Sequence, residues 1–407
     1  PGAHRGRDAQ ARRLLKPPAI GVKEFAHRRE ALWAGMDAAG FDALVLFYPA
    51  RIAYLTGFHH VPTERPIALV LGDGYSAMVV PAVEKEHAEG LAGIDRVIVY
   101  FEYPGDRHPL ERVQEALVEI NAAPSRVAAD HDGQVPFWGY RGPRLSDLTG
   151  NPVADGEMLV EELRRVKSPA ELGCIQVACD WAARGHRRMQ AAIRAGQTEM
   201  ESYAPAELET LREMIAEMPG WRPRGFGSSG LTAMFVAGES TAMPHGFVRG
   251  HGVQEGDVLV TGAAADIDGY GSELERTMFI GSPTAAQRSA FEAMAALQAR
   301  AIEVLKPGLP VAEVELEVRR LAVELGHEDH LRHHVGHSIG LEAHEAPFLD
   351  RGDPAVLEPG MVFTVEPGIY LPAVGGFRHS DTVVITAAGS RVMTDYPRDL
   401  ESLVVPA

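Results

Sequence analysis

The stretch from Leu259 to Gly281, LVTGAAADIDGYGSELERTMFIG, constrains the fold more than any other part of the chain. Two apolar runs flank a glycine-containing turn, which is the pattern of a strand pair. Alternation along the second strand puts Glu273, Glu275 and Thr277 on one face and Arg276 on the other. Two carboxylates side by side repel each other unless a cation, a proton or a buried histidine lies between them. We therefore expect this strand pair to carry a functional site.

Length and charge exclude several classes of protein. With 407 residues, the chain is long enough for two domains with separate cores. A formal net charge of −17 argues against non-specific binding to nucleic acid or to an anionic membrane. No apolar run approaches the length of a membrane span. Cys174 and Cys179 lie in a helical stretch on different faces, so we expect buried free thiols and a cytoplasmic location.

The pattern of periodicity divides the chain into three parts. Residues 1–20 are basic but lack the apolar core of a secretory signal, and we expect a flexible arm. Residues 21–155 alternate helical and β-branched runs, which predicts a small α/β domain. Residues 156–407 begin with two helices, the second opened by Ser168-Pro169 as N-cap and first helical residue, and continue as an α+β domain. Helices are expected at 23–40, 83–92, 108–122, 156–167, 169–195, 284–306 and 310–326, and early strands at 42–48, 66–71, 75–81 and 96–101, with a hairpin turn at Gly72-Asp73-Gly74.

Histidines are unusually dense near residue 337. His333, His334, His337 and His344 lie within the segment HHVGHSIGLEAHE, which is interrupted by glycines. A lone buried histidine is usually a satisfied core residue, but clustered titratable groups favour functional sites. We therefore expect these imidazoles to line a cavity, although a polar, solvated loop would give the same composition.

Five ordered motifs resemble those of the creatinase, aminopeptidase P and prolidase family. The similarity covers about residues 23–400, which makes it far more specific than one short pattern. It implies a C-terminal pita-bread domain in an α+β architecture, preceded by a smaller creatinase N-terminal-like domain of ribonuclease H-like α/β type. The motifs are RIAYLTGF at 51–58, STAMPH at 240–245, HHVGHSIGLEAHE at 333–345, EPGMVFTVEPG at 358–368 and GGFRHSDT at 375–382.

The resemblance also implies five metal ligands, namely two Asp, one His and two Glu. Their positions in this chain hold Gly262, Glu273, His337, Glu366 and Ser380. Because a bridged two-metal site needs several carboxylates, its loss is predicted, and with it the loss of any metal cofactor. If one ion is retained, Glu273, His337 and Glu366 are the ligands expected to hold it.

The ending Glu273-Leu274-Glu275-Arg276-Thr277 is similar to creatinase, the metal-free member of this fold. That similarity implies a hydrolase of a C–N bond in a small cationic or amide-containing substrate. His245 stands at the position of its general base and acid, and Glu275 and Glu366 at its cation-binding glutamates. Two carboxylates can hold a planar cation by charge-assisted hydrogen bonds.

Other residues complete this interpretation. His337 and His344 are expected to be catalytic and to donate hydrogen bonds to a developing oxyanion, with His333 and Glu273 near the substrate. The family also implies a homodimer in which the N-terminal domain of the neighbour approaches the cleft. Arg65 is the candidate to bind a substrate carboxylate there, although a surface arginine is an equal alternative.

Two further functions stay open. One is an Xaa-Pro dipeptidase or aminopeptidase with an altered, at most mononuclear metal site, favoured by the similarity outside the ligands. The other is a non-catalytic binding protein that keeps the fold, against which the retained histidines argue. The substrate itself cannot be named from the sequence.

Overall fold

The computed structural model describes residues 16–72, 74–123, 126–136, 139–224, 231–250 and 252–407. Most of the expected N-terminal arm and Asp73 of the expected hairpin turn lie outside these residues. Contacts divide the described chain into an N-terminal unit, Ile20–Val166, and a C-terminal unit, Lys167–Ala407, with which the described residues before Ile20 are grouped. Each unit has a hydrophobic core of its own.

The N-terminal unit is built on a six-stranded sheet of order β4-β3-β2-β1-β5-β6. The pairs β1–β2 and β2–β3 are antiparallel, whereas β3–β4, β1–β5 and β5–β6 are parallel. Its strands are β1 (Ala43–Leu46), β2 (Ala68–Gly72), β3 (Tyr75–Pro81), β4 (Arg96–Tyr100), β5 (Val127–Ala129) and β6 (Ala154–Asp155). Its helices are α1 (Val22–Ala39), α2 (Pro49–Thr56), η1 (Ala82–Glu84), α3 (Lys85–Glu89), α4 (Leu110–Glu119), α5 (Leu145–Thr149) and α6 (Glu157–Arg165).

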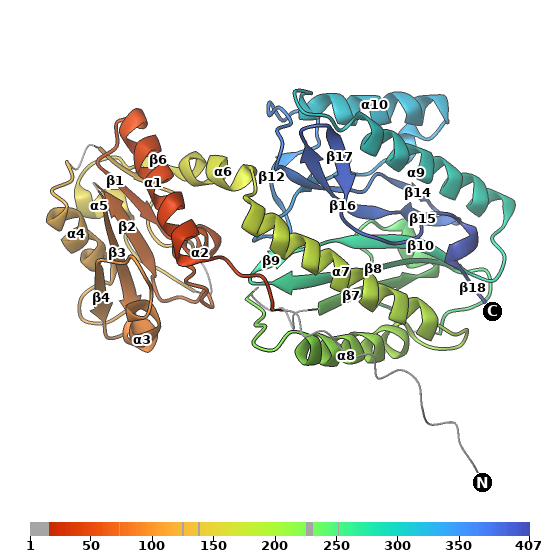
Figure 1. Ribbon diagram of the computed structural model, residues 1–407, viewed down its shortest axis with the longest axis horizontal. Coiled ribbons are helices and arrows are strands. Elements are labelled where there is room, and N and C mark those ends of the chain that lie inside the picture. The colour runs from red at the N-terminus through yellow and green to blue at the C-terminus, as the bar shows by residue number, and fades with distance from the viewer. Residues whose placement is uncertain (1–15, 73, 124–125, 137–138, 225–230, 251) are drawn as a thin grey trace, which may run out of the picture. The chain divides into compact units, whose positions relative to one another are not determined.

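The C-terminal unit is built on a curved antiparallel sheet whose path is β12-β11-β13-β16-β10-β8-β7 (Figure 1). Strands β17, β18 and β9 extend it by pairing with β16, β10 and β8. The strands of the unit are β7 (Leu231–Ala237), β8 (Val258–Ile267), β9 (Tyr270–Gly271), β10 (Leu274–Ile280), β11 (His337–Ser338), β12 (Glu345–Phe348), β13 (Val362–Val365), β14 (Gly368–Leu371), β15 (Gly375–Arg378), β16 (Ser380–Thr386), β17 (Gly389–Val392) and β18 (Val404–Val405). Of these, β14 and β15 form a separate two-stranded sheet.

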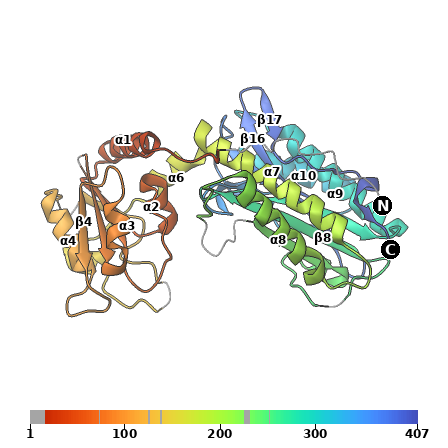
Figure 2. The ribbon, with the colours of Figure 1, turned by 60° about the horizontal axis from the view of Figure 1, so that its bottom comes forward.

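Four long helices cover this sheet. Helices α7 and α8 run side by side over β7 and β8, as the turned view makes plain (Figure 2), and α9 packs on β13–β15 with α10 beside it. Their bounds are α7 (Pro169–Ala192), α8 (Glu199–Glu217), α9 (Ala285–Val304) and α10 (Val311–Glu324), with short turns η3 (Gly238–Ala242), η4 (Glu328–His330) and η5 (Glu401–Leu403). The helices bury the outer face of the sheet and leave its inner face for the site.

Capping residues explain where two of the helices begin and end. Ser168 caps α7 as expected, and its hydroxyl and Glu171 form a reciprocal capping box with Pro169 as the first helical residue. Gly40 ends α1 in the left-handed conformation (φ 79°), again as expected. The sequence did not predict α2 or α8. Helix α2 is short, and Pro205 lies inside α8.

The unit boundary lies later than the sequence placed it. Helix α6, which was expected to open the second domain, belongs to the N-terminal unit. Tyr54 donates to the carbonyl of Leu163, and Arg51 is paired with Glu157 and Glu161. These bonds connect α6 to α2.

Two smaller findings concern the chain as a whole. Cys174 and Cys179 are both buried and do not form a disulfide, as predicted. None of the helices within the described residues is long and apolar enough to cross a bilayer.

Candidate active site

Glu273 immediately precedes β10 and is bonded to the neighbouring strand β16. Its backbone N–H donates to Thr382 Oγ1 (3.0 Å), and its carbonyl accepts from the same hydroxyl (2.9 Å). Its carboxylate accepts a hydrogen bond of 2.6 Å from the hydroxyl of Ser380. Ser380, at a position where the resemblance implied a ligand, therefore orients the neighbouring carboxylate.

His337 and Glu366 converge on the same place from β11 and from the end of β13. His337 is 1% exposed, and its Nε2 lies 3.1 Å from Glu366 Oε1 and 4.0 Å from Glu273 Oε2. Its Nδ1 lies 3.1 Å from the carbonyl of Ser338, which as an acceptor requires the proton on Nδ1 and directs Nε2 toward the carboxylates. Glycine is needed beside it, because a Cβ on Gly336 would collide with the carbonyl of Thr364.

These three side chains form a group with the composition of a metal site. One ligand atom from each of Glu273, His337 and Glu366 lies within 4.8 Å of the others. The buried Nε2 of His337 has no properly aligned hydrogen-bond partner among the described residues, despite its short contact with Glu366. Two carboxylates and an imidazole suit a single divalent ion such as Mn²⁺, Fe²⁺, Co²⁺ or Zn²⁺. The residues present therefore fit one ion.

The pKa values of the carboxyl groups also favour a bound cation. Burial, reinforced by the charges of Glu366 and Glu275, raises the pKa of Glu273 to about 8. Burial would also raise the pKa of Glu366, but the contact with His337 and the charge of Arg378 outweigh it and lower that pKa to about 2. One carboxyl of the group is thus held neutral at pH 7, and a bound cation would favour its ionised form.

Glu275 and Arg378 form a buried ion pair beside this group. The Arg378 guanidinium donates from Nε and Nη2 to the two oxygens of Glu275, with Nη2–Oε1 at 2.8 Å. Nη1 donates to the carbonyl of Pro244 (3.0 Å) and to the hydroxyl of Tyr370 (3.3 Å). The carboxylate that the sequence assigned to a substrate cation is therefore already engaged by a cation of the protein.

The remaining histidines surround the group at different depths. The exposed ring of His344 stacks on His337, with centroids 3.8 Å apart. His333 Nε2 lies 2.8 Å from the hydroxyl of Tyr370. His245 is exposed in the turn after η3. Burial lowers the pKa of His344, and the neighbouring imidazoles His337, His334 and His245 lower it further.

Three residues of this neighbourhood were not singled out from the sequence. Arg378 was visible within GGFRHSDT, but its role depends on Glu275, 103 residues away. Tyr370 carries no motif signal. The Nζ of buried Lys167 donates to Ser338 Oγ (2.9 Å) and Glu345 Oε2 (3.1 Å), and so it stabilises β11, which carries His337, and the adjacent β12. This role of Lys167 is visible only in the folded structure. Arg65, by contrast, lies in the N-terminal unit and is bonded to Glu102.

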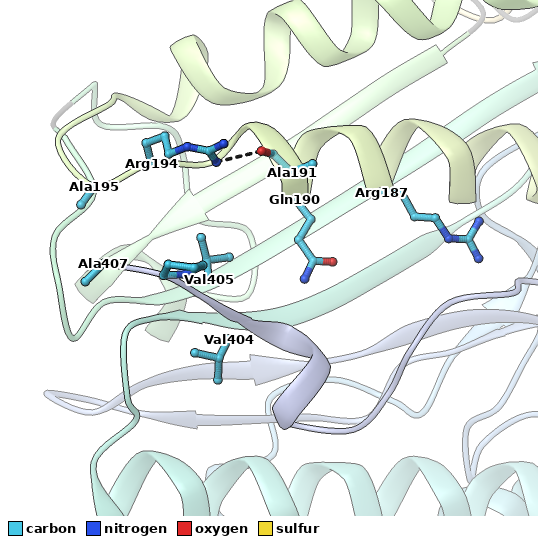
Figure 3. Close-up of a pocket in the computed structure, with 9 residues that line it drawn as sticks. Arg187, Gln190, Ala191, Arg194, Ala195, Val404, Val405 and Ala407 are labelled. Carbon is cyan, nitrogen blue, oxygen red and sulfur yellow. Dashed lines mark hydrogen bonds between the residues drawn. The ribbon is translucent and has the colours of Figure 1, made fainter. Parts of the chain in front are cut away.

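A pocket of about 740 Å³ opens elsewhere in the C-terminal unit, between the end of α7 and β18 (Figure 3). Its lining contains Arg187, Gln190 and Arg194 but no carboxylate or imidazole side chain. Arg194 is bonded to the carbonyl of Ala191, and Arg187 to Asp395. Its lining offers no general base or metal ligand, so we assign the chemistry to the Glu273–His337–Glu366 group.

Comparisons with known proteins decide the family. Residues 173–387 match Peptidase_M24, metallopeptidase family M24, and residues 28–166 match the creatinase/prolidase N-terminal domain. The chain belongs to metallopeptidase family M24. A relative, the Xaa-Pro dipeptidase of Pyrococcus horikoshii, is 33% identical over 366 residues, which cover 90% of this chain and 96% of the relative.

Solved structures of similar proteins agree with the fold. Dipeptidase PepE from Mycobacterium ulcerans superposes with a TM-score of 0.80 at 28% identity, covering 96% of this chain and 100% of that one. The prolidase from Pyrococcus horikoshii OT3 gives a TM-score of 0.77 at 25% identity, covering 92% and 99%. The predicted pita-bread domain with a creatinase N-terminal-like domain is confirmed, and the protein is a hydrolase that acts on C–N peptide bonds.

Membership of M24 also corrects the cofactor prediction. The expectation of no metal cofactor is wrong, because relatives in this metallopeptidase family are typically metal-dependent and Glu273, His337 and Glu366 are assembled as a possible ligand group. The sequence argument weighed the missing carboxylates at Gly262 and Ser380 more heavily than the ligands that remain. The metal-independent creatinase-like activity is not supported by these comparisons.

Proposed function

We propose that this chain is an Xaa-Pro dipeptidase or aminopeptidase that uses one divalent ion held by Glu273, His337 and Glu366. The observation that carries the proposal is the convergence of these three side chains on one point, with ligand atoms within 4.8 Å of one another. The name of the 33%-identical relative, Xaa-Pro dipeptidase, supports the substrate class.

The ion would supply Lewis-acid chemistry, polarising the scissile carbonyl and making a water acidic enough to attack at neutral pH. The protein supplies orientation and proton handling around it. Ser380 fixes Glu273 through its hydroxyl, and Ser338 fixes the tautomer of His337 through its carbonyl.

The exposed histidines act on the substrate side. His344 presents its imidazole over His337, where it can donate a hydrogen bond to an oxygen that gains negative charge as the peptide bond breaks. His245, exposed in its turn, would give a proton to the leaving nitrogen. His333 holds the hydroxyl of Tyr370 and thus acts on Arg378 rather than on the substrate.

A homodimer belongs to the same proposal. The Arg65 guanidinium is bonded to Glu102 and Glu64. In the proposed dimer, the carboxylate of a substrate bound to the neighbouring protomer would replace these glutamates as its partner. Sedimentation of the full chain tests this, since a fully active monomer would remove Arg65 from the site.

Peptide hydrolysis tests the activity. The full-length protein is stripped with chelator and assayed with and without Mn²⁺, Co²⁺, Zn²⁺ or Fe²⁺. The substrates are Xaa-Pro dipeptides, Xaa-Pro tripeptides, Ala-Ala and creatine. We expect metal-restored cleavage of Xaa-Pro bonds and none of creatine, and the two Xaa-Pro lengths separate dipeptidase from aminopeptidase. Creatine hydrolysis in chelator, or no Xaa-Pro cleavage with any ion, would overturn the proposal.

A further inference from the structure

Lys167 is a buried cation at the start of the C-terminal unit, between two strands of the candidate site. Its side chain is 1% exposed, and its Nζ donates to Ser338 Oγ on β11 (2.9 Å) and to Glu345 Oε2 on β12 (3.1 Å). The side chain of Glu345 is 2% exposed. Burial of an ammonium group is costly unless an opposite charge and hydrogen bonds compensate it. The contacts with both strands therefore fix the position of this ammonium group.

The two contacts of Lys167 are next in sequence to the stacked histidines. Ser338 follows His337, and Glu345 follows His344. The pairing of β11 with β12 is irregular here, because His337 lies opposite Phe348 whereas Ser338 lies opposite Glu345. An irregular register disrupts the ladder of backbone hydrogen bonds. The ion pair of Lys167 with Glu345 thus stabilises the strand pair at the place where the ladder does so least.

Both partners of this ion pair have little freedom to move. The backbone N–H of Lys167 donates to the carbonyl of Gly360 (3.0 Å). The other carboxylate oxygen of Glu345 accepts a hydrogen bond from the backbone N–H of Glu342 (3.1 Å). A Cβ on Gly340 would lie 2.8 Å from both oxygens of that carboxylate, so the loop before β12 packs closely around it. The ion pair therefore fixes the start of β12.

His337 and His344 depend on Lys167 to different degrees. His337 is held independently, since its backbone N–H donates to Thr364 Oγ1 (3.1 Å) and its Nδ1 lies 3.1 Å from the carbonyl of Ser338. Its strand also pairs with β13. His344 is exposed and precedes the first residue of β12. Its stack on His337, with 3.8 Å between the ring centroids, therefore depends on where Lys167 holds β12.

We infer that Lys167 is a positioning residue, which acts on the reaction by keeping the His344 imidazole in place over His337. The inference rests on the proposed function, in which His344 donates a hydrogen bond to the oxygen that gains negative charge. The ammonium group of Lys167 is buried and bonded within the protein, so its effect reaches the substrate only through His344. Displacement of a catalytic group by about 1 Å can lower the rate about a hundredfold.

A double-mutant cycle tests this inference. Full-length wild type, Lys167→Met, His344→Ala and the double variant are compared at saturating Mn²⁺ on the Xaa-Pro peptide that wild type cleaves. We expect Lys167→Met to lower kcat about a hundredfold when His344 is present. In the His344→Ala background the same change should lower kcat by less than about threefold, because residues that act as a unit are not additive. KM and Mn²⁺ affinity should change by less than about threefold, since His337 is held independently.

Two further variants separate this effect from a loss of folding. Lys167→Met leaves Glu345 buried without its counter-charge, so Lys167→Met/Glu345→Gln, which removes both charges, is taken through the same cycle. Lys85→Met is the matched control, because Lys85 forms an exposed ion pair with Glu89, and its kcat should equal that of wild type.

Losses of kcat that multiply in the His344→Ala background would show that Lys167 acts without His344, and they would overturn the inference. Unchanged kcat in both Lys167 variants would do the same, as would a loss of Mn²⁺ affinity as large as the loss of kcat. In these three cases wild type still cleaves Xaa-Pro bonds, and the one-ion peptidase stands. Wild type that cleaves no Xaa-Pro bond with Mn²⁺ would overturn both.

Discussion

The imidazole of His344 lies nearly flat on that of His337, with the ring planes 15° apart and the centroids 3.8 Å apart. One ring is buried in the ligand group and the other is exposed to solvent. The stack therefore links the proposed ion to the space that a substrate would occupy.

Removing His344 should impair turnover rather than folding. His344→Ala is expected to lower kcat for Xaa-Pro hydrolysis roughly a hundredfold, because a positioned hydrogen-bond or proton donor contributes on that order. Mn²⁺ affinity and the melting temperature should change little, since the ring is exposed. Steady-state kinetics with calorimetry separates these effects. An equal loss of Mn²⁺ affinity would show that His344 acts as a ligand or a support instead.

Metal binding at pH 7 should release about one proton from Glu273. The folded, metal-free protein holds this proton because burial and neighbouring carboxylates raise the pKa of Glu273 to about 8. The apparent Mn²⁺ affinity should therefore rise with pH up to about 8 and then level off as far as this group is concerned. Calorimetry in two buffers of different ionisation enthalpy counts the protons. A binding heat that does not depend on the buffer would mean that no proton is released, and it would contradict the assignment.

The same shift predicts how metal-free protein responds to pH. Between pH 4.5 and 8 the native state keeps the Glu273 proton that the unfolded chain has lost, so this group makes stability fall as pH rises. Denaturant unfolding should show a smaller fall in Glu273→Gln than in wild type. A larger fall in the variant would reverse the sign and refute this explanation.

His186 should make the protein sensitive to acid. It is fully buried, its Nε2 lies 2.9 Å from Thr261 Oγ1, and burial followed by the charge of Arg276 lowers its pKa to about 3. Below pH 6.5 the unfolded chain gains a proton that the native state cannot accept. Stability should thus fall by about 1.4 kcal/mol per pH unit from this group alone. Urea unfolding of wild type and His186→Gln between pH 7 and 4 measures the difference, and parallel pH profiles would contradict it.

Asp381 should be one of the residues most sensitive to substitution. It is fully buried and accepts hydrogen bonds from Arg276 (2.9 Å), Arg398 (2.7 Å) and Gln298 (3.0 Å). Asp381→Asn leaves Arg276 buried without its counter-charge, which should cost about 3 kcal/mol of unfolding free energy. The control is Asp395→Asn, which removes the exposed pair with Arg187 and should change stability by less than about 0.5 kcal/mol. Similar losses in both variants would rule out the buried pair as the cause.

Much of the fold follows from local sequence signals. Ser168-Pro169 and Gly40 mark helix ends because capping depends on a few adjacent residues. Helix α8 was missed because Pro205 argues locally against a helix, whereas packing on α7 and β7 stabilises it. The family, the pita-bread domain and the hydrolase class were predicted from ordered motifs.

The candidate site was predicted less completely. The three possible ligands were named as a set, since each occupies a motif position, but the absence of a cofactor was inferred from Gly262 and Ser380 alone. Sequence could not reveal that Gly262 makes room for Glu275, or that Arg378 already binds Glu275, because both facts depend on strand register. Pairings between distant residues are set by topology rather than by local pattern.

The most direct test is Mn²⁺ occupancy measured together with Xaa-Pro hydrolysis. Metal-free wild type, Glu366→Gln and a control, Glu358→Gln at an exposed position of the same motif, are titrated with Mn²⁺ and assayed at each step. We predict one ion per chain and hydrolysis that rises in proportion to occupancy in wild type and the control, with both lost in Glu366→Gln. Full Xaa-Pro hydrolysis by metal-free protein, or undiminished Mn²⁺ binding in Glu366→Gln, would contradict a one-ion site at Glu273, His337 and Glu366.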